Sequence, residues 1–284
     1  MSVATLRSEP EPAPSRVRGV AEVGFVRKQD KTRLDHLFQH DPLRVLFPTP
    51  LTDEPPCAVL VTTSGGLVGG DRLDISVTAG PDTQVLAMAQ AAEKVYRSAG
   101  DDSRIDVHLS VGENAGLEWL PQETILFDGA RLRRCTIIDL AAGANILAGE
   151  ILVFGRIASQ ERLTQGLLRE EWRVHREGRL VWADALHLEN DIAYTFAEPA
   201  CFDGATAQAT AIYAGNDAFQ HLDLARSLLD DKLRTAATVV NGVLVVRWLG
   251  PDPAQLRRAF GKFWAGFRHG STGRPATLPR LWTI

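Results

Sequence analysis

Three stretches of the chain repeat one layout at an interval of about 30 residues, and this spacing constrains the fold more than any other feature. Each stretch has a short alternating strand, a turn that contains glycine, and a second apolar strand that ends in Gln or Glu. One two-strand unit cannot bury its apolar face alone, whereas stacked neighbours can. We therefore predict a mainly β protein, a coiled or β-helical stack of short strands. The three stretches are ISVTAGPDTQVLAMAQ (75–90), LSVGENAGLEWLPQ (109–122) and IDLAAGANILAGE (138–150).

Other segments indicate strands and tight hairpins. Residues 105–111 alternate strictly between apolar and polar side chains, which is typical of a strand with one buried face. Asn241-Gly242 separates two apolar runs, and this pair tolerates the positive φ angles of a type I′ turn. Glu177-Gly178 separates two further alternating runs within residues 169–182. These hairpins keep a sandwich of antiparallel hairpins open as the alternative fold.

Two segments towards the C-terminus have helical spacing instead. The first follows Asn216-Asp217, a candidate N-cap, and the second follows Asp252 as N-cap with Pro253 at the first helical position. We expect both helices to cover a face or an edge of a sheet; a helix that docks a partner is the alternative. The closing segment GRPATLPRLWTI ends in apolar residues, so we expect it to be docked. The two apolar stripes are Leu222, Ala225, Leu229 and Leu233, and Leu256, Phe260, Phe263 and Phe267.

Charge and apolar content narrow the class of protein. A net charge of −4 and a pI near 6.0 argue against nucleic-acid binding, which favours basic patches. No apolar run approaches the roughly 20 residues that span a bilayer, and the first residues lack the apolar region of a secretory signal. The polar, proline-bearing residues 1–18 are predicted to be a disordered tail, and residues 19–284 to form a single domain. Cys57, Cys135 and Cys201 lie far apart, which suits buried thiols in the cytoplasm.

The stretch TTSGGLVGGDRLDISV (62–77) raises the possibility of a phosphate-binding loop. Gly65 and Gly70 have the spacing of such a loop, but Asp71 stands where a lysine is needed, and a strand pattern follows instead of a helix. Nucleotide binding at this loop is therefore not expected. The glycines suit a tight turn that packs close to a neighbouring coil or a partner.

Two other kinds of site also have little support. Ser64 lacks the G-x-S-x-G surroundings of a hydrolase nucleophile. His36 and His40 have i,i+4 spacing, but neither a cysteine nor an H-E-x-x-H pattern accompanies them, so no tight metal cage is predicted.

What remains is a set of carboxylates beside glycines or at strand ends. Glu150 follows Gly149 and precedes the apolar run ILVF, where an ionised group costs free energy unless it is paired. Asp71 follows a glycine pair, where an aspartate commonly hydrogen-bonds its own turn, so a structural and a functional role both stay open. The set is Asp71, Glu93, Glu123, Asp128, Glu150 and Asp184.

Seven segments in order, from about residue 20 to the C-terminus, resemble the family of the urease accessory protein UreD, called UreH in some organisms. One departure is visible: family members commonly carry His and Pro ahead of the glycine pairs, whereas this chain has VTTS at 61–64. The departure puts in doubt any role of that position in handling nickel. The segments are SGGLVGGDRLDISV, EKVYRS (93–98), GLEWLPQETILFDGA (116–130), GEILVFGR (149–156), EGRLVWADAL (177–186), NGVLVVRWL and GRPATLPRLWTI.

The resemblance implies a chaperone with a β-helical core, not an enzyme. Members of the family join UreF and the GTPase UreG, the assembly engages urease apoprotein, and nickel is installed while UreG hydrolyses GTP. No permanently bound cofactor is implied; Ni²⁺ would be bound transiently. A passage for Ni²⁺ needs oxygen ligands that bind weakly enough to release the ion.

We therefore predict a scaffold for urease maturation, with Asp71, Glu150 and Asp184 as candidate residues of a nickel passage. Lys94, Tyr96 and Arg97 combine charge with an aromatic ring, a composition that suits a partner interface. The alternative is a carbohydrate-active enzyme on a β-solenoid, with Glu118, Glu123 and Asp128 as acid and base. A binding module without a metal role is a third possibility.

Overall fold

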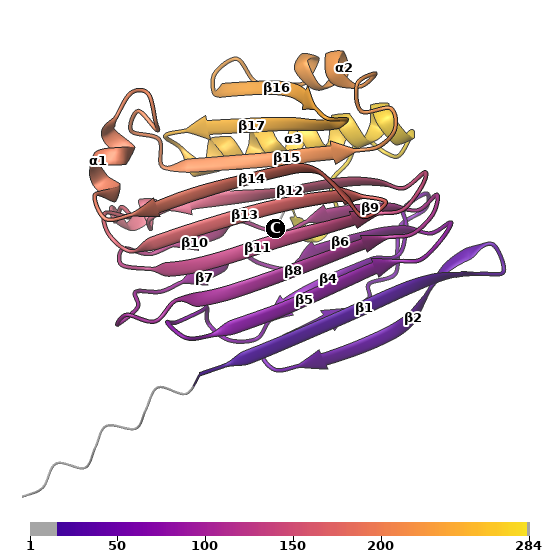
Figure 1. Ribbon diagram of the computed structural model, residues 1–284, viewed down its shortest axis with the longest axis horizontal. Helices are drawn as coiled ribbons and strands as arrows, with labels where there is room; N and C mark the ends of the chain where they lie inside the picture. Colours follow the sequence, from indigo (N-terminus) through magenta and orange to yellow (C-terminus); the bar gives the residue numbers. More distant parts are fainter. Residues whose placement is uncertain (1–15, 283–284) are drawn as a thin grey trace, which may run out of the picture.

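The computed structural model describes residues 16–282, and about half of them belong to the strands of two β-sheets. The first sheet has seven strands in the order β14-β13-β11-β8-β5-β1-β2 (Figure 1). Their bounds are β1 Arg18–Lys28, β2 Lys31–His40, β5 Arg72–Ala79, β8 Ser103–Val111, β11 Arg131–Leu140, β13 Leu167–Arg176 and β14 Arg179–Glu189.

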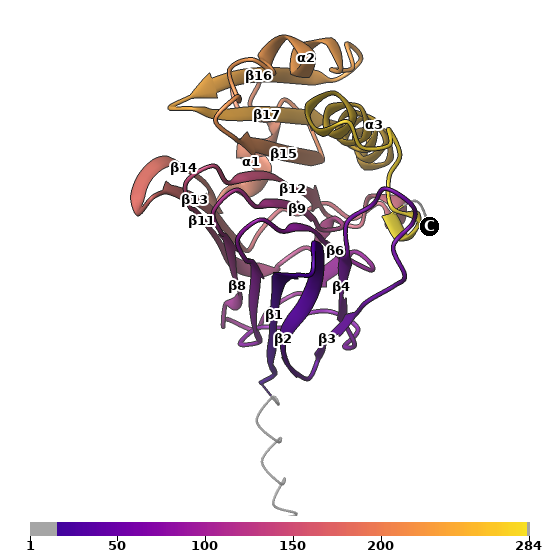
Figure 2. The ribbon, with the colours of Figure 1, turned by 90° about the vertical axis from the view of Figure 1, so that its right-hand side faces the viewer.

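The second sheet lies opposite the first, as the edge-on view of Figure 2 shows. Its main path runs β16-β17-β15-β12-β9-β6-β4-β3, and two short strands, β7 and β10, pair beside β12. Their bounds are β3 Leu43–Leu46, β4 Cys57–Thr62, β6 Gln84–Ala89, β7 Glu93–Val95, β9 Gly116–Leu120, β10 Thr124–Leu126, β12 Asn145–Phe154, β15 Ala207–Ala214, β16 Arg234–Val240 and β17 Val243–Gly250.

The middle of both sheets is a parallel coil, which confirms the β-helical prediction. Strands β5, β8, β11 and β13 pair in parallel in the first sheet, and β4, β6, β9 and β12 do so in the second. Each repeated stretch places its first strand in one sheet and its second strand in the other. A third, narrow side aligns buried residues of successive coils: Leu67 bridges Val95, which pairs with Leu126, which pairs with Phe154.

Antiparallel hairpins flank this coil. β1 pairs with β2 at one end, and β13–β14 and β16–β17 form hairpins at the other. The turns between the last two pairs are those predicted from Glu177-Gly178 (φ 49° and 76°) and Asn241-Gly242 (φ 50° and 78°). The hairpins that suggested a sandwich therefore exist, but they extend the coil and do not replace it.

The long helix α3 (Pro253–Thr272) covers the outer face of the second sheet, where it lies along β15 and β17 (Figure 2). Asp252 caps it as predicted, because its side chain accepts hydrogen bonds from the backbone N–H groups of Ala254 and Gln255. The predicted apolar stripe of this helix is buried against Trp248 of β17. The closing segment is docked up to Trp282, which is buried and stacks on Phe260; residues 283–284 lie outside the described part.

The other predicted helix is shorter than expected. Helix α2 spans only Leu222–Ser227, so Leu229 and Leu233 lie beyond its end. Asp217 is not its N-cap, because the Asp217 carboxylate accepts hydrogen bonds from Tyr213 and pairs with His221. A turn that leads to β16 begins directly after it. A short helix, α1 (Ile192–Ala197), and the 3₁₀ turns Ile157–Ser159 and Arg280–Trp282 were not predicted.

Two further predictions meet mixed outcomes. Cys57 is buried, but Cys135 is half-buried and Cys201 is exposed, so the expectation of three buried thiols was wrong. Residues 1–15 of the predicted tail lie outside the described residues, whereas Arg16 pairs with Asp101 and the Val17 N–H donates to Asp71. Within residues 16–282, no helix combines the length and the hydropathy that a membrane crossing needs.

Candidate functional site

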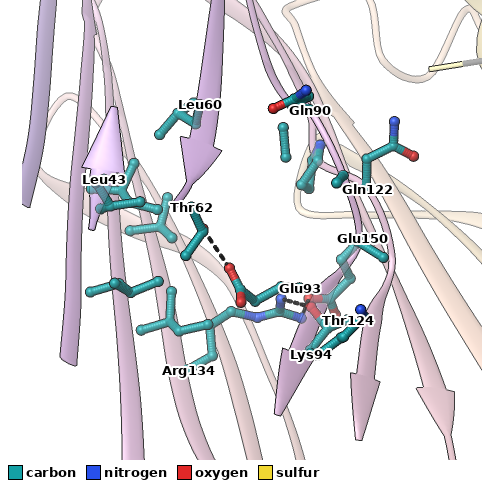
Figure 3. A pocket seen from close by; sticks show the side chains of 18 of the residues that line it. Leu43, Leu60, Thr62, Gln90, Glu93, Lys94, Gln122, Thr124, Arg134 and Glu150 are labelled. Atoms are coloured by element: carbon teal, nitrogen blue, oxygen red, sulfur yellow. Dashed lines mark hydrogen bonds and ion pairs between the residues drawn. The ribbon is translucent and has the colours of Figure 1, made fainter. Parts of the chain in front are cut away.

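A cavity of about 240 Å³ lies between the two sheets (Figure 3). Its lining residues range from exposed Gln90 and Ala91 to buried Arg134 and Trp172, so it leads from the surface into the core. Side chains with oxygen atoms come from several coils and both sheets. These side chains are Thr62, Ser64, Gln90, Glu93, Gln122, Thr124, Thr136 and Glu150.

Arg134 organises the inner end of the cavity. Its Nη2 donates to Glu150 Oε2 at 2.5 Å, its Nε to Glu170 Oε2 at 2.7 Å, and its Nη1 to Thr124 Oγ1 at 2.9 Å. Trp172 Nε1 donates to the other oxygen of Glu150 at 3.0 Å. The guanidinium is 9% exposed and the two carboxylates are 5% and 2% exposed, so the ion pairs are almost fully shielded from water.

Strand register explains this arrangement. Arg134 lies on β11 directly opposite Glu170 on β13, and side chains at paired positions share a face of the sheet. Their neighbours Arg133 and Glu171 point to the outer face, because successive side chains of a strand alternate. Glu150, on β12 of the second sheet, reaches the same guanidinium from across the cavity.

At the inner end of the cavity, two carboxyl groups share the guanidinium of Arg134: Glu150, which lines the cavity, and Glu170, which lies beside it. Burial raises the pKa of Glu170 well above its usual value, the Glu150 carboxylate raises it as well, and Arg134 opposes both effects. Glu170 Oε1 is buried and has no hydrogen-bond partner among residues 16–282. Burial also raises the pKa of Glu93, against a hydrogen bond of 2.7 Å from the Thr62 hydroxyl. Both raised pKa values favour the neutral forms of these carboxyl groups, which limits the acidic charge that the Arg134 guanidinium has to balance.

The glycine-rich segment forms one wall of the cavity, and the strand β5 follows it, as the sequence indicated. Gly66 has a φ of 140°, and a Cβ atom there would lie 2.6 Å from the carbonyl oxygen of Lys94 on the next coil. A Cβ atom on Gly69 would lie 2.7 Å from the carbonyl oxygen of Asp101. Both glycines thus allow the close approach of two coils, as the sequence predicted.

The three candidate carboxylates of the nickel passage do not meet. Glu150 lines the cavity, but Asp71 and Asp184 do not. Asp71 is buried, and its two oxygens accept hydrogen bonds from the backbone N–H groups of Val68 and Val17, at 3.0 and 2.9 Å. It therefore serves as the acceptor of its own turn, the structural role that the sequence left open.

Asp184 lies on β14 and pairs with Arg247 of β17 at 2.5 Å, where the two sheets approach each other. In the first sheet, three strands separate β14 from β5, which follows Asp71. Four strand spacings correspond to roughly 19 Å at about 4.8 Å each. Asp71 and Asp184 consequently belong to separate parts of the molecule.

Two of the three residues proposed for a partner interface share a surface groove. Lys94 and Tyr96 line an open depression of about 640 Å³ together with apolar residues of β10 and β12 and the start of α3. Tyr96 donates to the Gly65 carbonyl at 2.8 Å, and Lys94 has no side-chain partner among residues 16–282. Arg97 lies outside the groove and pairs with Asp128 at 2.8 Å.

The carboxylates of the alternative enzyme hypothesis occupy three separate ion pairs. Glu118 is buried with Arg268 and Arg274, and Glu123 pairs with Arg257 at 3.0 Å. Asp128 accepts hydrogen bonds from the Thr164 and Gln165 backbone as well as pairing with Arg97. Each group fastens one segment to another, which explains its position without catalysis.

The histidine pair gives no metal site either. His36 and His40 lie on the strand β2, where His36 pairs with Glu22 and His40 contacts the Arg18 carbonyl. Across the part of the chain that the structure describes, no group of three or more His, Cys, Asp or Glu residues could hold a metal ion.

Sequence reasoning did not identify Arg134, Thr124 and Trp172, which line the cavity, or Glu170, which pairs with Arg134 at its inner end. A signal was present for two of them. Buried residues occupy every second position of RLRRCTIIDL (131–140) and of the middle of LLREEWRVHR (167–176). This alternation places the second arginine of Arg133-Arg134 and the first glutamate of Glu170-Glu171 on the inner face. Arg134 and Glu170 are each separated from buried apolar residues on either side in their strands by an even number of positions, so their side chains point to the same face.

Comparison with known proteins supports the resemblance. The sequence model of the family described as UreD urease accessory protein matches residues 17–283. The urease accessory protein UreD of Magnetococcus marinus is 50% identical over 289 aligned residues, which cover 100% of this chain and 99% of that protein. The corresponding protein of Azorhizobium caulinodans is 39% identical, with 96% and 99% of the two chains covered. That of Granulibacter bethesdensis is 41% identical, with 84% and 99% covered.

Proposed function

Because the chain belongs to the UreD urease accessory protein family, which serves urease maturation and is not catalytic, we propose that it is a scaffold through which nickel reaches urease. In this proposal the chain binds UreF, the GTPase UreG and urease apoprotein in the cytoplasm. Nickel is the cargo of the assembly and is not a resident cofactor.

The polar cavity between the sheets is the observation that carries the proposal. It combines carboxyl, amide and hydroxyl oxygens from successive coils, and oxygen ligands bind Ni²⁺ less tightly than imidazole or thiolate ligands do. Conduction of an ion requires binding that is favourable enough for entry and weak enough for exit. Arg134 supports such weak binding, since it neutralises Glu150 in part and lowers the affinity of the site for a cation.

Among the predicted passage residues, the cavity favours Glu150 and adds Glu93 to it. Both carboxyl groups face the same space, Glu93 nearer the Thr62 side and Glu150 at the inner end beside Arg134 (Figure 3). Asp71 and Asp184 remain proposals without this support, because their carboxylates lie outside the cavity and are held by other groups.

For the partner surface, the proposal keeps Lys94, Tyr96 and Arg97. The groove beside Lys94 and Tyr96 has an apolar floor that includes Phe127 and Val153, and the Lys94 ammonium is exposed at its edge. Apolar floors with charged rims are typical of protein interfaces. Arg97 would contribute from outside the groove.

The test uses the variant Glu93→Gln/Glu150→Gln, which keeps the side-chain volume and removes both charges. Glu22→Gln, on the outer face of β1, is the matched control. We expect the cavity variant to co-purify with UreF, UreG and urease apoprotein, while the urease it activates contains less nickel and has lower activity. The control should match the wild type in all three measurements.

Two outcomes would count against separate parts of the proposal. Normal nickel content with the cavity variant would refute passage through the cavity. Failure of the wild-type chain to associate with any of the three proteins would refute the scaffold.

A further inference from the structure

Five arginines form a row on the outer face of the seven-stranded sheet. Arg18, Arg72, Arg104, Arg133 and Arg169 occupy paired positions on the adjacent strands β1, β5, β8, β11 and β13 (Figure 1). Adjacent strands are about 4.8 Å apart, so the backbone positions of these arginines repeat at that interval across the sheet. We call these five residues the arginine row.

An acidic row runs beside it, two residues further along the strands. Asp74, Asp106 and Glu171 belong to this row, and they neutralise most of the arginine row. Arg18 and Arg72 pair with Asp74 at 3.3 and 2.8 Å, and Arg72 also reaches Asp106 at 3.1 Å. The remaining pairs are Arg133 with Asp102, at 2.5 Å, and Arg169 with Glu171.

Arg104, the middle member, differs from the other four. Its side chain is exposed and has no ion pair or hydrogen bond with residues 16–282. It lies between Arg72 and Arg133, and like charges at directly paired positions of a sheet repel each other. The Arg104 guanidinium therefore has no carboxylate paired with it among the described residues, and a carboxylate from outside the chain could supply that pair. Guanidinium groups bind carboxylates through two parallel hydrogen bonds.

We propose that the arginine row, centred on Arg104, docks an acidic surface of a protein partner. The acidic row argues against a continuous polyanion: it lies roughly 7 Å away along the strands and would repel a second line of negative charge. A protein surface can place carboxylates over one row and neutral or basic groups over the other. The inference rests on the proposed function, since the partner is a member of the urease-maturation assembly.

The test measures binding of the full-length chain to urease apoprotein, UreF and UreG separately, at about 0.1 M and about 1 M salt. Arg104→Glu reverses the unpaired charge without breaking an internal ion pair. Arg33→Glu is the matched control, because Arg33 is also an exposed arginine of this sheet, on β2, without a side-chain partner among residues 16–282. Thermal unfolding of both variants verifies that they fold.

We expect Arg104→Glu to weaken the binding of one of the three proteins at least about tenfold at the lower salt concentration, and less at the higher one. Arg104→Lys should weaken the same binding by a smaller factor, because lysine keeps the positive charge. Some affinity should still be lost, because lysine cannot form the two parallel hydrogen bonds. Arg33→Glu should leave all three affinities within about twofold of the wild type.

Other results would overturn the inference. Equal effects of Arg104→Glu and Arg33→Glu on every partner would do so while leaving the scaffold proposal intact. The inference would also be overturned if Arg104→Glu weakened binding only to duplex DNA, used as a polyanion probe, and left the affinities for all three proteins unchanged. Absence of binding by the wild-type chain would remove the proposed function itself.

Discussion

The buried cluster around Arg134 predicts a large and pH-dependent loss of stability when the guanidinium is removed. Arg134→Met keeps a long side chain but leaves the buried carboxyl groups of Glu150 and Glu170 without their cation. Removal of one partner from a buried ion pair costs about 3–5 kcal/mol, because the remaining charge stays shielded from water. We expect a decrease of that size in the free energy of unfolding near neutral pH.

The sign of the pH dependence follows from Glu170. Burial already raises the pKa of Glu170 in the folded wild-type chain, and loss of Arg134 raises it further. The folded state then retains a proton that the unfolded state releases, so stability is highest below the ordinary pKa of a glutamate and falls as the pH rises towards the folded-state pKa. The loss caused by Arg134→Met should therefore be smaller at about pH 5 than at about pH 8.

Denaturant unfolding across this pH range, followed by circular dichroism, measures the effect. Arg133→Met is the matched control: the same substitution one residue earlier, on the outer face, where the side chain is 35% exposed and pairs with Asp102. A partly exposed pair contributes about 1 kcal/mol or less. Replacing Glu150 and Glu170 by Gln in the Arg134→Met background should restore much of the stability. Equal losses from Arg133→Met and Arg134→Met, or a loss that does not grow with pH, would refute the reasoning.

Two further predictions concern the packing of the coils and the cysteines. Gly66→Ala should lower the free energy of unfolding by about 1–3 kcal/mol more than Gly100→Ala does. The two glycines have similar φ angles (140° and 148°), but only a Cβ atom on Gly66 would clash with its surroundings. Equal losses in urea unfolding would contradict this prediction. Burial, helped by the nearby carboxylates of Glu118 and Glu54, raises the pKa of Cys57 to about 12, whereas Cys201 is exposed. At about pH 8, iodoacetamide should therefore alkylate Cys201 well before Cys57, as mass spectrometry of the native chain would detect, and similar rates would show that Cys57 is accessible.

Much of the fold could be predicted because its signals are local. The repeated stretches, the two turns and the cap of α3 depend on neighbouring residues, so alternation and turn chemistry were sufficient. The length of α2 was not predicted because Asp217, the presumed cap, is held by Tyr213 and His221, contacts that depend on tertiary structure. The repeat interval correctly favoured a coil over a sandwich, and the parallel pairing between distant strands confirms that choice.

The site was harder to predict, since a charged residue in a strand is normally assigned to the wet face. In Arg133-Arg134 and Glu170-Glu171, one residue of each pair is buried, and the residue type does not reveal which. Which residue of each pair is buried follows from the alternation of the neighbouring apolar residues, because the buried one lies an even number of positions from them. Glu150 was identified for the right physical reason, since an acidic residue within a buried apolar run needs a partner, and Arg134 is that partner.

The two surfaces that matter in the proposals are built from adjacent residues of the same strands. On β11, Arg133 belongs to the arginine row and Arg134 to the cavity; on β13, Arg169 lies outside and Glu170 inside. Parallel pairing aligns both sets from coil to coil, so a row on the outer face necessarily has a second row behind it. Such a sheet can present fixed charges to a partner on one face and polar groups to an ion on the other. The sheet backbone between them keeps the two environments apart, which allows the cavity to stay partly neutralised while the outer face carries an uncompensated cation at Arg104.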